Sequence, residues 1–323
     1  MEPNDLSSRH DLGVGLPPGV EEALRRVGDI ARRDGAELFV KGGVACYLYT
    51  SLFLGDEARH LRLRPVSADI DWTCPPGEIP VRQHLAILGA ASGHTVTCTE
   101  DRESCAHIVY GSKIARGSMM VRDGSKVELD LIPTCRFAPD ATRFMYEFGI
   151  EPSSEIVRTP KPAIDGVRLN SREIILSEKL GLGRGADLGK FDIVDSALLL
   201  SLGPIEPRSL KETLGQQRYS EVVDGRIARD VCRGVLVTAL EPSYGFSGDL
   251  TERLDRLSMD DLKQLSLCVR LGESLAQIDT STLERFFSPR TPPALASKLQ
   301  EQLARNVCEV REALRAFATQ LVG

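Results

Sequence analysis

The sequence lacks any apolar run that approaches the ~20 residues needed to span a bilayer, and residues 1–18 lack the apolar stretch of a secretory signal peptide. We therefore expect a cytoplasmic protein with no membrane partner, in which residues 1–18 form a flexible leader.

The sequence also lacks an excess of positive charge, because the formal net charge is −6 at pH 7. This balance offers no general attraction to nucleic acid, so an RNA partner would need a local basic surface.

Paired metal-binding cysteines are absent as well. The eight cysteines are scattered, with no Cys-x-x-Cys pair and no His/Cys spacing typical of zinc sites. Reduced thiols are therefore expected in place of disulfides or zinc ligands. Tryptophan occurs only once, at Trp72, and we expect it to pack in the core and not to stack on a base.

The length of 323 residues, with 42% hydrophobic and 27% charged residues, is sufficient for two globular domains. Hydrophobic periodicity predicts an α+β fold, with a mixed β-sheet and flanking helices in residues 19–150 and a mostly α-helical second domain in residues 151–323. The expected strands are 36–40, 67–71, 95–99, 106–110, 118–122 and 126–132, and a loop-rich passage is expected at 133–162. The expected helices are 20–33, 44–52, 80–91, 171–180, 190–200, 208–214, 220–240, 260–275, 282–287 and 293–317.

A Gly-Gly turn stands between the first expected strand and the second expected helix, in the sequence Lys41-Gly42-Gly43. Backbone N–H groups and the positive end of a helix at such a turn are suited to binding phosphate. The alternative is a tight strand-to-helix turn that binds no ligand.

Three acidic residues lie on two expected strands. Asp69 and Asp71 alternate with Ile70, so both project from one face of a strand, and Asp130 has the same kind of alternation within 127–131. Clustered carboxylates repel one another, and a hard divalent cation such as Mg²⁺ removes that penalty. Glu128 shares the face of Asp130, so either acid could complete the set. Ser67 shares the face of the two aspartates and could bind a phosphate oxygen or the backbone.

The order of these elements resembles the DNA polymerase β-like nucleotidyltransferase superfamily over residues 36–132, with a Gly-Gly turn, Asp-x-Asp and a later third acid. The match favours Asp130 over Glu128 as that acid. The 25 residues between Gly43 and Asp69 exceed the compact spacing of the superfamily.

A second block sharpens the resemblance. It contains Lys179-Leu180, then Arg184, and then Lys190-Phe191-Asp192 with Asp195 three residues later. This order is similar to the signature of the AbiEii/AbiGii nucleotidyltransferase toxins, although here Phe191 separates Lys190 from Asp192. Taken alone, Lys179 could be a surface lysine, and Asp192 could complement the dipole at the start of a helix.

The resemblance implies transfer of a nucleoside monophosphate from a nucleoside triphosphate to a hydroxyl, with Mg²⁺ of the two-metal type. It implies that Asp69, Asp71 and Asp130 bind the metal, and that Lys41, Gly42, Gly43 and Ser67 bind the nucleotide phosphates. Lys179 would neutralise charge on the triphosphate. Asp130 would act as a metal ligand or a base, and Asp192 as a base or a positioning residue.

The resemblance also implies partners. The acceptor would be an RNA, the 3′ end of tRNA, whose modification would block aminoacylation and translation, and a cognate antitoxin would neutralise the toxin. Two alternatives remain open. One is a nucleotidyltransferase acting on a small molecule of the antibiotic type, and the other is a catalytically silent nucleotide-binding module.

Overall fold

The computed structural model describes residues 16, 18–63, 69–73, 86–87, 90, 115–122, 124–131, 135–137, 148–150, 163–164, 167–185, 191–205 and 250–323. The strands expected at 95–99 and 106–110 and the helices expected at 208–214 and 220–240 lie outside the described residues. Most of the helix expected at 80–91 does too.

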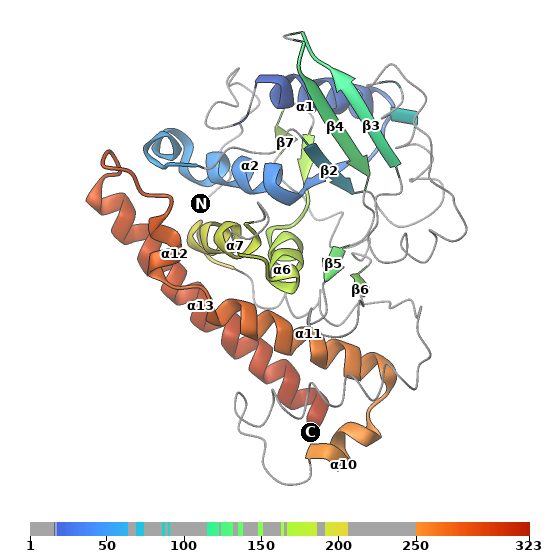
Figure 1. Cartoon of the computed structure of the whole chain (residues 1–323), viewed down its shortest axis with the longest axis vertical. Helices are drawn as coiled ribbons and strands as arrows, with labels where there is room; N and C mark the ends of the chain where they lie inside the picture. The colour runs from blue at the N-terminus through green and yellow to red at the C-terminus, as the bar shows by residue number, and fades with distance from the viewer. Residues whose placement is uncertain are drawn as a thin grey trace.

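A six-stranded mixed sheet forms the centre of the upper part in Figure 1, with the strand order β3-β4-β2-β1-β8-β7. Its strands are β1 (Phe39–Lys41), β2 (Asp69–Thr73), β3 (Ala115–Met120), β4 (Lys126–Leu131), β7 (Ala163–Ile164) and β8 (Val167–Leu169). Parallel pairing joins β2 to β4 and β1 to β8, and the other three neighbours pair antiparallel. Two further strands, β5 (Cys135–Phe137) and β6 (Phe148–Ile150), pair with each other.

Helices cover the sheet and form the lower part of the molecule (Figure 1). Helix α2 lies between the sheet and the pair α6–α7, and it packs against β1, β2, α6 and α7. Helices α11 and α13 run side by side, and α13 also packs against α7. The helices are α1 (Pro18–Arg33), α2 (Gly42–Leu54), η2 (Gly55–His60, 3₁₀), α6 (Arg172–Leu182), α7 (Asp192–Ser201), α10 (Leu250–Arg256), α11 (Met259–Ala276), α12 (Thr280–Glu284) and α13 (Pro293–Val322).

Hydrophobic patterning explains where these helices lie. Helix α1 is amphipathic, with Glu21 in its first turn and Arg32 and Arg33 in its last, and both ends suit the helix dipole. Helix α2 is apolar almost all round, and it is accordingly enclosed between the sheet and other helices. One continuous cluster of buried side chains runs from Val20 to Phe317 and includes Trp72, which confirms the expectation for the single tryptophan.

The structure confirms a mixed α/β chain with a mixed sheet, and it corrects several of the expected elements. The first strand begins at Phe39 and not at residue 36, and β3 begins three residues before its expected start at residue 118. The passage at 133–162, expected to be loop-rich, contains β5 and β6. The short helix expected at 282–287 is α12, displaced to Thr280–Glu284. Among the described residues, η2, β7, β8 and α10 also have no counterpart among the expected elements.

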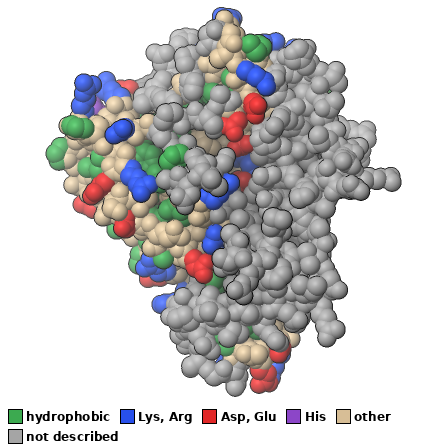
Figure 2. Space-filling model, viewed as in Figure 1, with side chains coloured by type: hydrophobic (Ala, Val, Ile, Leu, Met, Phe, Trp, Pro, Cys, Tyr) green, Lys and Arg blue, Asp and Glu red, His purple; other side chains and the backbone are tan. Residues whose placement is uncertain are grey.

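The visible surface of the described residues mixes both signs of charge. Figure 2 shows Lys and Arg side chains interspersed with Asp and Glu on this face, without a broad area of either sign among the coloured atoms. Among the described residues, no helix is long and apolar enough to cross a membrane.

Candidate active site

The Gly42-Gly43 turn connects β1 directly to α2, as the sequence predicted. Gly42 has a φ of +68°, a conformation that glycine adopts without steric cost. A Cβ atom at Gly42 would lie 2.3 Å from Oδ2 of Asp71. Glycine is therefore required here for two reasons, the backbone conformation and the close approach of the Asp71 carboxylate.

Asp69 and Asp71 lie on β2, half-buried, and alternate with the fully buried Ile70. The parallel register between β2 and β4 places Asp69 opposite Glu128 and Asp71 opposite Asp130. The backbone of Asp130 thus stands beside that of Asp71, and the backbone of Glu128 beside that of Asp69. On the other side of β2, Asp71 is the register partner of Lys41.

Parts of the predicted metal and phosphate site fall outside what the structure describes. Ser67 lies outside the described residues, and for Asp130 only the backbone is described. Among the described side chains, no group of three or more His, Cys, Asp or Glu is close enough to hold a metal ion. The residues present nevertheless fit Mg²⁺, because Asp69 and Asp71 offer only oxygen donors and the Asp71 carboxylate occupies the space that a Cβ at Gly42 would fill.

Lys41, predicted to bind phosphate, is buried and forms an ion pair. Its side chain is 2% exposed, and its Nζ lies 3.0 Å from Oε1 of Glu178 on α6. This contact joins the last residue of β1 to a helix more than 130 residues later in the chain.

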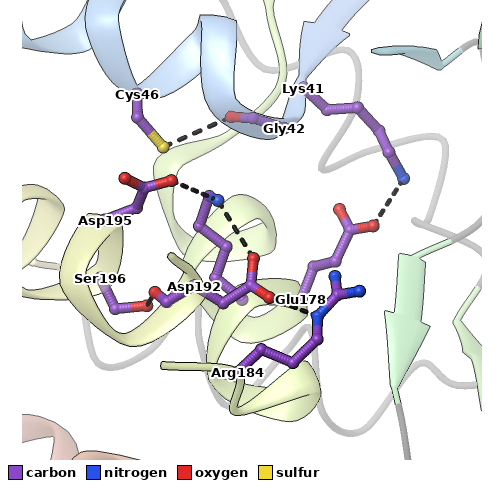
Figure 3. Close-up of polar contacts among 9 residues, drawn as sticks. Lys41, Gly42, Cys46, Glu178, Arg184, Asp192, Asp195 and Ser196 are labelled. Atoms are coloured by element: carbon purple, nitrogen blue, oxygen red, sulfur yellow. Dashed lines mark hydrogen bonds and ion pairs between the residues drawn. The ribbon is translucent and has the colours of Figure 1, made fainter. Parts of the chain in front are cut away.

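Lys179 contacts two aspartates of α7, Asp192 and Asp195, both labelled in Figure 3. Its Nζ donates to Oδ2 of Asp195 at 2.7 Å and to Oδ1 of Asp192 at 3.3 Å. Arg184 Nε donates to the other Asp192 oxygen, Oδ2, at 2.7 Å. The side chain of Lys179 is 7% exposed, so the alternative of a surface lysine is wrong.

Electrostatics keeps Lys179 charged. Burial lowers the pKa of Lys179, but Asp195, Cys46 and Asp192 raise it by more, so the pKa of Lys179 lies above its usual value. The two carboxylates, the ammonium and the partly exposed guanidinium of Arg184 therefore form a group without net charge, in which each charge depends on the others.

Local sequence signals set the ends of α6 and α7. The Ser171 hydroxyl caps α6 by accepting from the N–H of Ile174, and Gly183 ends the helix in the left-handed conformation. Between the two helices the N–H of Ile193 donates to the carbonyl of Arg184 at 3.0 Å. Asp192 lies in the first turn of α7, where a carboxylate also complements the helix dipole. Lys190 lies outside the described residues.

The two sequence blocks meet beneath the first turn of α2. The thiol of Cys46 donates to the carbonyl of Gly42 at 3.3 Å, and Asp195 lies next to Cys46 in Figure 3. The Gly-Gly turn, the Lys41–Glu178 pair and the Lys179 cluster thus occupy one region at the junction of α2, α6 and α7.

No role for Glu178, and no contact between Asp195 and Lys179, was predicted from the sequence. Glu178 stands immediately before Lys179 in the sequence, but its partner Lys41 is too distant in the chain for helical spacing to reveal the pair. Asp195 did carry a signal, since it lies three residues after Asp192 on one helix face.

No protein-family model matches the chain, and no curated protein or solved structure matches it.

Proposed function

We propose that the chain is a Mg²⁺-dependent nucleotidyltransferase, which transfers a nucleoside monophosphate from a nucleoside triphosphate to a hydroxyl of an acceptor. The observation that carries this proposal is the approach of the Asp71 carboxylate to the backbone of Gly42. It brings a half-buried pair of acids next to the first turn of a buried helix. A metal–triphosphate complex needs carboxylate oxygens for the cation and backbone N–H groups for the phosphates in the same place.

In this proposal, the acids and the Gly42-Gly43 turn bind different parts of the metal–nucleotide complex. Asp69 and Asp71, with Asp130, would hold Mg²⁺, and the backbone of Gly42 and Gly43 would donate to the phosphates. Ser67 would add a hydroxyl donor. Bound Mg²⁺ of the two-metal type would stabilise the charge that develops on the attacking and leaving oxygens. The protein's own task is then to orient the triphosphate for in-line attack.

The Lys179 cluster supports a positioning role for Asp192. Both carboxylate oxygens of Asp192 accept from cationic donors, Lys179 on one side and Arg184 on the other. A carboxylate held in this way is not placed to accept a proton from the acceptor hydroxyl. In this proposal Asp192 orients α7, and Lys179 holds α7 to α6 beneath the turn.

The resemblance to AbiEii/AbiGii toxins supplies the acceptor and the partner. We propose that the acceptor is RNA, the 3′ end of tRNA, and that modification blocks aminoacylation and translation. A cognate antitoxin would restrain the enzyme. Residues 19–150 would form the nucleotidyltransferase domain, and the helical region of residues 151–323 would contribute late active-site residues and bind the acceptor.

The test is a labelling experiment with the purified protein, total tRNA, Mg²⁺ and each α-labelled nucleoside triphosphate in turn. We expect label in tRNA with the wild type and with Asp29→Asn, because the Asp29 side chain is 67% exposed on α1. We expect none with Asp69→Asn, which replaces one carboxylate oxygen at the proposed metal site. Unfolding in urea checks that both variants are folded.

Two results would change the proposal. Undiminished transfer by a folded Asp69→Asn variant would refute the assignment of the site. Label that never enters tRNA would redirect the search to a small hydroxyl-bearing acceptor, an outcome in keeping with the net charge of −6. In that case, expression would confer drug resistance and would not be toxic.

A further inference from the structure

We propose that Glu178 is a positioning residue that orients the Gly42-Gly43 turn through Lys41. The inference rests on the proposed function, because the task assigned to the turn is to hold a triphosphate. It also revises the role predicted for Lys41, from a phosphate ligand to the link between the turn and α6.

The position of Lys41 in the chain is the first reason. Lys41 is the last residue of β1 and the N-cap of α2, so its Cα immediately precedes Gly42. Its side chain makes no capping hydrogen bond to α2 and instead reaches Glu178, with 3.0 Å between Nζ and Oε1. A side chain fixed at its far end restrains the backbone from which it starts, and that backbone begins the turn.

Enclosure of the pair is the second reason. The side chains of Lys41 and Glu178 are 2% and 9% exposed. An ammonium group that approached a bound triphosphate would have to leave this carboxylate, which would stay buried. Separating a buried pair in this way is strongly unfavourable.

The neighbourhood of Asp71 is the third reason. Lys41 and Asp71 are register partners on antiparallel strands, so the two side chains lie on the same face of the sheet. A lysine without a partner there would compete with a metal ion for the carboxylates. The ion pair with Glu178 offsets the charge of Lys41 beside the proposed cation site.

Helix α6 is well suited to fix Glu178. Consecutive residues of an α-helix project about 100° apart, and here Glu178 reaches β1 while Lys179 reaches α7. Contacts with β1 and with α7 therefore hold the helix on two sides, so the Glu178 carboxylate is fixed in position and can in turn fix Lys41.

The experiment is a double-variant cycle with Lys41→Met, Glu178→Leu and the combination of the two, with Glu173→Leu on the same helix as the control. Affinity for inorganic triphosphate is measured by calorimetry in EDTA, so that neither the base nor a metal contributes. Transfer kinetics with Mg²⁺ give the KM for the nucleotide and kcat. Urea unfolding of each variant reports the stability.

We expect each single variant to bind triphosphate about tenfold more weakly than the wild type. In the transfer assay, the KM for the nucleotide should rise by about the same factor, and kcat should change less. The double variant should bind no more weakly than the weaker single variant, because Glu178 acts through Lys41. It should also regain most of the urea midpoint, since an apolar pair can replace a buried ion pair. Glu178→Gln, which keeps an acceptor for Lys41, should bind more tightly than Glu178→Leu.

The outcomes separate this proposal from the proposed function. Additive losses in the double variant, or a double variant with wild-type affinity, would overturn the role of Glu178 while transfer by the wild type stands. A wild type that binds no triphosphate and transfers no label would overturn the proposed function and the positioning role together. Weaker binding by Glu173→Leu equal to that of Glu178→Leu would also refute the assignment, because it would mean that any change on α6 disturbs the turn.

Discussion

Replacement of Lys179 by methionine tests the buried cluster most directly. Methionine is similar in length and removes only the charge and the three N–H donors. Asp195 loses a donor at 2.7 Å, in a side chain that is 1% exposed. Asp192 loses a donor at 3.3 Å but keeps Arg184 at 2.7 Å.

The expected cost follows from these contacts. Breaking a buried ion pair by removing one partner costs about 3–5 kcal/mol, because the remaining charge is left uncompensated in the interior. The retained Arg184 contact and the other interactions of Asp195 favour the lower end, about 3 kcal/mol. Domains are stable by about 5–15 kcal/mol in total, so the variant should fold but unfold at a much lower urea concentration.

Urea unfolding at several pH values provides the assay, with Lys298→Met as the control. Lys298 is 63% exposed and pairs loosely with Glu57, so its replacement should cost less than about 1 kcal/mol. The pKa of Lys179 lies above its usual value, so its contribution to stability is fully present from pH 5 to 8, and the loss in Lys179→Met should be seen throughout this range. A loss below about 1 kcal/mol at pH 8 would refute the reasoning.

Three further predictions concern single residues, all measured by urea unfolding. Gly42→Ala should lose more stability than Gly35→Ala, although both have a φ near +65°, because only the Cβ at position 42 meets Asp71. Equal losses would mean that the contact is unimportant. Asn306→Ala should cost about 3 kcal/mol, because its Nδ2 donates to the carbonyls of Leu200 and Gly203 and its Oδ1 accepts a backbone N–H. A cost below about 1 kcal/mol would contradict this. Burial raises the pKa of the Cys268 thiol, so the free energy of unfolding should fall above about pH 9, where the thiol ionises only in the unfolded chain. In Cys268→Ala, the fall of the unfolding free energy with pH should be shallower by about 1.4 kcal/mol per pH unit.

The elements with strong local signals were predictable from the sequence. Helices α1, α6, α11 and α13 combine apolar periodicity with recognisable ends, such as Ser171 at the start of α6 and Gly183 at its end. The strands expected at 118–122 and 126–132 from their alternation correspond to β3 and β4. Alternation also predicted that acidic residues of two strands would share a face, and the register places Asp69 opposite Glu128 and Asp71 opposite Asp130.

The features that escaped prediction depend on contacts between distant segments. Strand β8 is three residues long, so its pattern is too short to stand out, and it is stabilised by pairing with β1. The burial of Lys41 and Lys179 could not be predicted either, because a lysine is expected to be exposed unless its carboxylate partner is known. Each of these lysines finds that partner on an element that only the fold brings near.

The parallel pairing of β1 with β8 has a consequence for how the chain can be divided. In the strand order, β1 lies inside the sheet, between β2 and β8. A fragment that ended at residue 150 would leave β1 as an open edge, able to pair with another chain, and would leave Lys41 without Glu178. Strand β8, which leads directly into α6, must pair with β1 before the Gly-Gly turn has its final neighbours. During synthesis, the turn therefore cannot reach its final environment until residues beyond 165 have been made.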